Sequence, residues 1–187
     1  MTDVLFVQGA GEGVHDDWDR KLVESLRREL GPHYDVRYPR MPNEADPQLR
    51  TWRPVLEREL TALRAAGVIV GHSVGGTLML HVLGDSKLAT TPGAIVLIAP
   101  PFIGKGGWES GGDELRADLA ERMPADVPIF LYHGEDDDTV PVAHVERYAE
   151  LLPRACVRRL AGRDHQLNDD LSEVAGDIRA LETEATR

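Results

Sequence analysis

The chain of 187 residues is 42% hydrophobic and 28% charged, which is typical of a globular protein large enough for one core and too small for two comfortable domains. Its formal net charge of −11 argues against nucleic acid and against anionic membrane surfaces as partners, because both require clustered lysine and arginine. The single cysteine, Cys156, excludes an internal disulfide and suits a reducing compartment. No apolar run approaches the roughly 18 residues of a membrane helix, and no signal core precedes the first strand. We therefore expect one cytoplasmic domain over residues 1–187.

Apolar runs of strand length alternate with stretches of helical periodicity along the chain. Short apolar runs bounded by glycine or proline predict buried strands, and apolar residues three or four apart predict helices that present one stripe to a core. The expected strands are residues 4–7, 34–38, 68–70, 94–98, 129–132 and 156–160. The expected helices start near residues 16–17, 46–47, 53–54 and 73, and further ones lie within 113–122, 142–152 and 167–181. This alternation predicts an α/β fold with a mainly parallel sheet of about six strands.

The stretch Gly71-His72-Ser73-Val74-Gly75 joins a run of β-branched residues to an apolar run of helical length. Gly-x-Ser-x-Gly between a strand and a helix is the context of a nucleophile elbow, whose sharp turn strains the serine backbone and lifts its hydroxyl above the sheet edge. Glycine is needed at both ends of this motif, because strand and helix pass too closely for a Cβ. Ser73 is therefore the expected nucleophile.

A serine hydroxyl needs a base within hydrogen-bond reach, and that base is oriented by a third group. Among seven histidines, His165 is the best placed, since it follows the last expected strand in a loop at the carboxyl edge of the sheet. His133 follows the fifth strand at the same edge and is the rival.

The acid is expected in the run Glu135-Asp136-Asp137-Asp138, which leaves the fifth strand at this same edge. Its spacing lacks the alternation and the glycine of a calcium loop, so we expect a solvated turn with one functional carboxylate and no metal. The residues alone leave Asp136, Asp137 and Asp138 open as the acid.

Two other patterns are weaker. The segment Gly9-Ala10-Gly11-Glu12-Gly13 follows a strand, but a dinucleotide fingerprint needs its third glycine where Val14 stands. Cys156 lies in an expected strand, where a cysteine behaves as a small hydrophobic residue rather than a nucleophile.

Together these motifs resemble the α/β-hydrolase superfamily, from the strand which that family counts as third to nearly the end of the chain. The order of nucleophile, acid and histidine is the order of that family. Its pattern Gly-x-x-Asp-x-x-Val-Pro matches Gly134 to Pro141 and implies that Asp137 is the acid, with Ser73 and His165 completing a catalytic triad. The resemblance implies a single-domain, three-layer α/β/α fold.

The resemblance also implies an oxyanion hole. The family's glycine loop resembles Gln8-Gly9-Ala10-Gly11, which implies donor N–H groups at Ala10 and Val74. Many members have His-Gly where this chain has Gln8-Gly9, but backbone N–H groups should survive that change. Without the family's first two antiparallel strands, the chain resembles the compact serine hydrolases of the retinoblastoma-binding-protein and YdeN type.

The expected function is hydrolysis of a small carboxylic ester, or of a thioester or amide, without a cofactor. The glycine-rich segment 100–126 is expected to be a small cap or an active-site loop, and its few large apolar residues suggest an open site for small acyl groups. Trp108 in this segment is a candidate for the pocket, whereas Trp18 is expected to pack within its helix. A non-catalytic binding or interaction module is the alternative from a different class.

Overall fold

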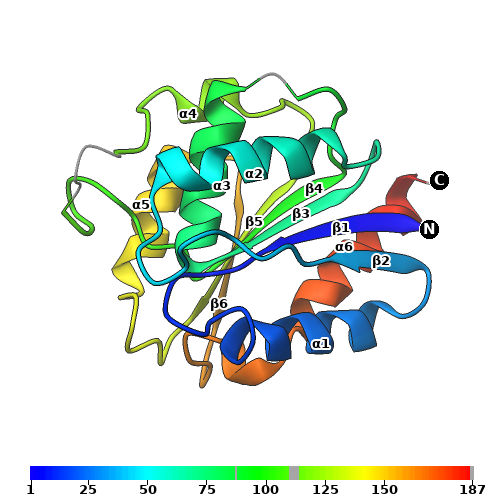
Figure 1. Ribbon diagram of the computed structural model, residues 1–187, viewed down its shortest axis with the longest axis horizontal. Coiled ribbons are helices and arrows are strands. Elements are labelled where there is room, and N and C mark those ends of the chain that lie inside the picture. The colour runs from blue at the N-terminus through cyan, green and yellow to red at the C-terminus, as the bar shows by residue number, and fades with distance from the viewer. Residues whose placement is uncertain (87, 110–113, 186–187) are drawn as a thin grey trace.

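A six-stranded parallel sheet lies between two layers of helices in the computed structural model, which describes residues 1–86, 88–109 and 114–185 (Figure 1). The strand order is β2-β1-β3-β4-β5-β6, and every neighbouring pair is parallel. The strands are β1 Thr2–Val7, β2 Tyr34–Arg37, β3 Val68–His72, β4 Ala94–Ile98, β5 Ile129–Gly134 and β6 Cys156–Leu160. The predicted sheet is confirmed, with the elbow strand β3 near its centre.

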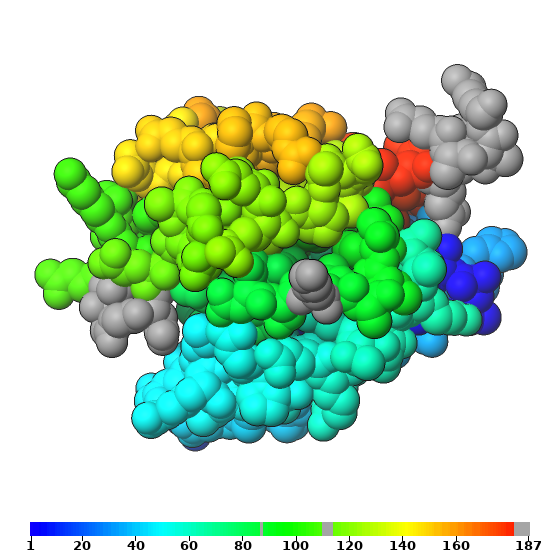
Figure 2. Space-filling model, turned by 90° about the horizontal axis from the view of Figure 1, so that it is seen from above, coloured from blue at the N-terminus to red at the C-terminus, as the bar shows by residue number. Residues whose placement is uncertain are grey.

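Helices cover both faces of the sheet. One layer holds α1 (Trp18–Leu30) and α6 (Ser172–Ala185), which pack against each other. The other holds α2 (Leu49–Thr61), α3 (Ser73–Asp85), α4 (Leu119–Arg122) and α5 (Ala143–Leu151). Figure 2 looks onto this second layer, where the cyan surface of the α2 region and the yellow-green surface of the α4 region flank the green chain between them. Of the helices in the described ranges, none is both long and apolar enough to cross a membrane.

The two buried clusters correspond to the two faces of the sheet. Alternate side chains of β1, β3, β4 and β5 enter one cluster with α1 and α6 or the other with α2, α3 and α5. A strand covered on both faces is apolar throughout, which explains the uniformly apolar runs of β3 and β4. Because all strands are parallel, their carboxyl ends meet at one edge.

Two expected helices prove to be one. The sequence predicts helix starts at 46–47 and 53–54, but α2 begins at Leu49 and contains Pro54. Proline donates no N–H, so one helical hydrogen bond is missing near the start of α2. The fully buried Trp52 and Leu56 side chains compensate for that loss.

The predicted helices at 113–122 and 167–181 are also modified. The first is only the short α4, and residue 113 lies outside the described residues. In the second, the three residues of η1 (Leu167–Asp169) have positive φ values of 51°, 57° and 57°, so the chain makes a left-handed turn before α6 begins. Local side-chain bonds hold this turn, because Asp164 accepts hydrogen bonds from the N–H groups of Gln166 (3.0 Å) and Asn168 (2.7 Å).

The closest backbone approach in the sheet is at the elbow. A Cβ on Gly75 would lie 2.0 Å from the Gln8 carbonyl oxygen, and a Cβ on Gly71 would lie 2.6 Å from the Gly76 Cα. Both obstacles are backbone atoms, so neither can move aside as a flexible side chain would. The glycines of the motif therefore allow α3 to start directly above β1 and β3.

We predict that Gly75→Ala destabilises the protein by more than about 3 kcal/mol or prevents folding, because overpacking against backbone cannot relax. The measurement is urea unfolding followed by circular dichroism. The matched control is Gly176→Ala in α6, where a Cβ would meet nothing within 4 Å; it should stabilise the helix by about 0.5–1 kcal/mol. An unchanged urea midpoint for Gly75→Ala would contradict the close crossing.

Candidate active site

Ser73 lies at the junction of β3 and α3 with a φ of +50°. This left-handed conformation is strained for a residue with a side chain, and the surrounding structure must enforce it. The close crossing of strand and helix at Gly71 and Gly75 supplies that constraint. The strain predicted for the elbow is thus present in the backbone.

His165 brings its ring between Ser73 and Asp137. Its Nε2 lies 3.1 Å from the Ser73 Oγ, and its Nδ1 lies 2.8 Å from the Asp137 Oδ2. A carboxylate only accepts hydrogen bonds, so Nδ1 carries the hydrogen and the Nε2 lone pair faces the serine hydroxyl. In this tautomer His165 can take a proton from Ser73.

The Asp137 carboxylate is fully buried and well supplied with donors. The N–H groups of Thr139 (2.9 Å) and Val140 (2.7 Å) donate to its Oδ1. Burial alone would raise the pKa of Asp137, but hydrogen bonds from His133, His165 and the Val140 N–H hold this pKa well below its usual range. The group therefore stays ionised at neutral pH.

The candidate acids and bases differ in their position relative to Ser73. Asp136 and Asp138 are exposed, and only Asp137 of the run contacts His165. The rival His133 lies behind the acid, where its Nε2 is 2.8 Å from the Val140 carbonyl oxygen and 3.3 Å from the Asp137 Oδ2. His133 thus supports the carboxylate and does not contact the serine.

Burial sets the protonation of His165. Burial of the ring lowers the pKa of His165, and the nearby His72 lowers it further. The Asp137 carboxylate raises this pKa but does not offset the other two effects, so the pKa of His165 lies below its ordinary value of 6.5. His165 is consequently neutral at pH 7, as a general base must be.

Ala10 and Val74, the two residues expected to supply oxyanion donors, both line the cleft at Ser73. Val74 is in the first turn of α3, where N–H groups have no partner within the helix. Within the described ranges the Ala10 N–H also has no hydrogen-bond acceptor, whereas the neighbouring Gly9 N–H donates to Asp19 (2.6 Å) and the Gly11 N–H to the Glu44 carbonyl oxygen (2.7 Å). The loop is held on both sides of Ala10.

Gln8, which departs from the family pattern, has a structural role in this loop. Its fully buried side chain accepts a hydrogen bond from the Met41 N–H (3.0 Å) and donates to the Glu44 carboxylate (2.8 Å). Glu44 in turn accepts a hydrogen bond from the Gly13 N–H (3.0 Å). The glutamine therefore ties the glycine loop to the segment that follows β2.

A cleft of about 550 Å³ opens above Ser73 and His165. Trp108 lines it and is 37% exposed, as expected for a pocket residue. Trp18 also lines it and is 54% exposed, so the prediction that Trp18 packs within its helix is wrong. Trp18 is the first residue of α1, whereas the leucines that follow it on the same stripe are buried.

The rim of the cleft is acidic. Glu12 and Asp138 are exposed and line it, and no lysine or arginine is among its described lining residues. Lys21 is close by, 5.5 Å from the centre of the Trp18 ring, and is paired with Asp169. An anionic group entering the cleft would meet carboxylates first.

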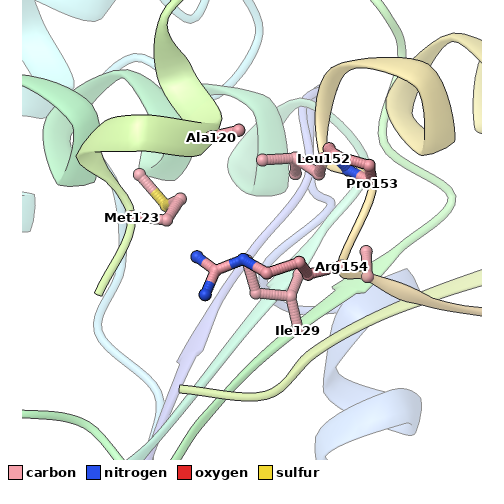
Figure 3. Close-up of a pocket in the computed structure, with 7 residues that line it drawn as sticks. Ala120, Met123, Ile129, Leu152, Pro153 and Arg154 are labelled. Carbon is pink, nitrogen blue, oxygen red and sulfur yellow. The ribbon is translucent and has the colours of Figure 1, made fainter. Parts of the chain in front are cut away.

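A second hollow lies at the opposite edge of the sheet, among Met123, Ile129 and Leu152 (Figure 3). The Arg154 side chain extends across it, and its guanidinium donates to the Ala125 carbonyl oxygen. The enclosed space is about 10 Å³, roughly what one water molecule needs. It is too small for a substrate and distant from Ser73.

Two polar residues beside the site, Asp19 and His72, were not predicted to have a role there. The His72 ring lies against Asp19 of α1. The sequence feature that could have indicated a role for Asp19 is its position: a carboxylate next to Trp18, at the start of a helix whose apolar stripe is buried. Among the described residues no group of three or more histidine, cysteine or acidic side chains is arranged to hold a metal ion.

Comparison with known proteins identifies the family and the fold. A family model described as serine hydrolase matches residues 4–169. The chain is similar to the ydeN gene product of B. subtilis (19% identity, 98% of this chain and 100% of the other, TM-score 0.74). It is similar to a putative YdeN-like hydrolase of Pectobacterium atrosepticum (18%, 97% and 92%, TM-score 0.68) and to Est1E of Butyrivibrio proteoclasticus with bound ferulic acid (14%, 98% and 89%, TM-score 0.68). No curated protein sequence matches.

We predict that the His165 ring titrates below pH 6.5, because its burial disfavours the charged form more than Asp137 favours it. The measurement is a pH titration of the histidine ring signals by NMR, with His165 assigned from the His165→Ala spectrum. A His165 pKa above 6.5 would contradict the prediction.

Proposed function

We propose that this chain, which belongs to the serine hydrolase family, cleaves a small carboxylic ester through an acyl-enzyme on Ser73. The observation that carries the proposal is the continuous contact from Ser73 Oγ through His165 to Asp137, built on a strained elbow. This contact supports the proposal because it joins a serine hydroxyl to a neutral base and an ionised acid, the three groups that nucleophilic catalysis needs.

In the first half of the reaction, the Ser73 Oγ attacks the ester carbonyl carbon while His165 Nε2 takes the hydroxyl proton. The Asp137 carboxylate holds the His165 ring and stabilises its transient positive charge. The carbonyl oxygen becomes negative and would accept hydrogen bonds from the N–H groups of Ala10 and Val74. One such donor typically accounts for about a hundred- to a thousandfold in turnover.

His165 then returns the proton to the alcohol oxygen, the carbon–oxygen bond breaks, and the acyl group stays on Ser73. Water repeats the sequence, with His165 accepting its proton and then delivering that proton to Ser73 as the acid leaves. The same steps would serve a thioester or an amide. No cofactor enters any of them.

The cleft favours a small acyl group without negative charge. Its floor is Ser73 and His165, two tryptophans flank it, and its rim carries Glu12 and Asp138. Among the described residues the lining mixes glycines, acidic and polar side chains with the two tryptophans, which favours a short acyl group over a fatty one. A carboxylate on the substrate would be repelled by the rim.

We predict that a fluorophosphonate probe adds once to the wild-type protein, which intact mass measures directly. Ser73→Ala should abolish the adduct. His165→Ala should slow labelling at least a hundredfold, the lower range for losing a general base. The control His33→Ala changes an exposed histidine and should label at the wild-type rate. If the folded wild type takes no adduct, the non-catalytic binding module becomes the better reading.

We also predict that kcat/KM falls along a series of esters from acetyl to decanoyl. A hemisuccinate ester should have a lower kcat/KM than the 4-methylpentanoate ester of the same alcohol, in which an isopropyl group replaces the carboxylate. The double variant Glu12→Gln/Asp138→Asn should reduce this difference in kcat/KM, since it removes the rim charges and retains the shape of the side chains. A steep rise with chain length, or an unchanged difference, would contradict this substrate class.

A further inference from the structure

A second histidine–carboxylate pair lies directly behind the nucleophile. Asp19 of α1 and His72 at the end of β3 have side chains that are 0% and 1% exposed, and Asp19 Oδ1 lies 2.8 Å from His72 Nδ1. The two atoms lie at ion-pair distance, although their approach does not have the direction of a hydrogen bond. The proposed chemistry gives neither residue a role.

Both ring nitrogens of His72 face oxygen acceptors. Nδ1 faces the Asp19 carboxylate, and Nε2 lies 3.1 Å from the carbonyl oxygen of His165. A neutral imidazole carries hydrogen on one nitrogen only, so in either tautomer the other nitrogen would lie 2.8 or 3.1 Å from an acceptor oxygen with no hydrogen of its own between them. The imidazolium has hydrogen on both nitrogens, so these two short contacts favour a charged ring.

The charge on His72 is matched within its own surroundings. Burial alone would lower the pKa of His72, but Asp19, the His165 carbonyl and Asp137 together raise this pKa above its ordinary value. One oxygen of Asp19 also has a hydrogen-bond donor, because its Oδ2 accepts the Gly9 N–H at 2.6 Å, while Oδ1 faces His72 without a directed hydrogen bond. A buried carboxylate with both a cation and a hydrogen-bond donor meets the conditions for a stable buried ion pair.

These contacts join three segments that are distant in sequence. Asp19 holds Gly9 in the glycine loop, His72 precedes the nucleophile, and the His165 carbonyl belongs to the loop of the base. The fit is close, because a Cβ on Gly9 would lie 3.1 Å from Ser73 Cβ and 3.2 Å from His72 Nδ1. A shift of the pair would therefore move the proposed oxyanion donor and the base relative to Ser73.

We propose that the Asp19–His72 ion pair is a positioning device that fixes the glycine loop and the His165 loop around Ser73, with His72 as a permanent imidazolium. The proposal rests on the proposed serine chemistry. It adds an electrostatic effect: the two histidine rings are 4.9 Å apart, and a fixed positive charge at that distance disfavours protonation of His165.

The ionisable groups that surround His72 are few. Asp19 faces it from α1, Asp137 from the loop after β5, and His165 from the loop after β6, while Tyr38 lies near Asp19. The carboxylates of Asp19 and Asp137 favour the charged form of His72, and His165 is neutral when it acts as a base. Loss of the His72 charge should therefore raise the pKa of His165.

The test uses the full chain and begins with ¹⁵N NMR of the histidine rings in the wild type. Both nitrogens of His72 should be protonated at pH 7–8. A neutral His72 at pH 7 would overturn the proposal. This readout does not depend on turnover, so it stands even if the probe fails to label Ser73 and the proposed function is wrong.

The variants then test positioning. His72→Gln keeps a donor for the His165 carbonyl but removes the charge, and Asp19→Asn removes the carboxylate in a side chain of the same shape. Each should slow probe labelling by about tenfold to a hundredfold, the range expected for small misplacement of reacting groups. The double variant should be labelled at most a few-fold more slowly than the slower of the two single variants. The two effects should not add in full, because the two residues act as one unit.

The pH profile separates positioning from a purely structural role. In His72→Gln the acid limb of the labelling rate should move to higher pH, because the charge beside His165 is gone. Asp17→Asn, an exposed change two residues from Asp19, is the matched control and should leave rate and profile unchanged. The proposal would be overturned if His72→Gln and Asp19→Asn both fold, are labelled at the wild-type rate and keep the acid limb of the wild-type pH profile.

Discussion

The fold depends on one steric constraint, the contact between α3 and the end of β1. The carbonyl oxygen of Gln8 occupies the space that a Cβ on Gly75 would need, and the Gly76 backbone occupies the space beside Gly71. This crossing forces the turn between β3 and α3 to be so tight that Ser73 takes a positive φ. It also anchors Gln8, whose side chain holds the next loop through Met41. Nucleophile and glycine loop are therefore positioned by the same contact.

The parallel sheet supplies the rest of the convergence. Ser73 and His165 are 92 residues apart in the chain, and Asp137 and His165 are 28 apart, yet all three follow the carboxyl ends of β3, β5 and β6. Parallel strands require every connection to return across a face of the sheet, so the loops that leave the strands share one edge. What the sheet does not fix is the path within each loop. Here the left-handed turn of η1 and its bonds to Asp164 determine where His165 points.

This division explains how much of the site could be predicted. Ser73 and His165 were predictable because their positions follow from strand order and from a motif whose glycines have a steric reason. Asp137 needed the family pattern, since three neighbouring aspartates fit the turn equally well until the Thr139 and Val140 N–H groups select one. The placement of Trp18 was wrong because periodicity gives the face of a helix but not where that helix ends relative to the sheet.

Asp19 and His72 could not be predicted, because their pairing depends on how α1 docks against the end of β3. Yet they show how one residue type takes two states within one site. Each histidine contacts a buried carboxylate through Nδ1, and the partner of Nε2 decides the rest. At His165 that partner is the Ser73 hydroxyl, which can donate, so the ring can be neutral and act as a base. At His72 it is a carbonyl oxygen, which can only accept, so in the proposed ion pair the ring keeps both protons. The difference between a base and a fixed cation is thus the difference between a hydroxyl and a carbonyl at about 3 Å.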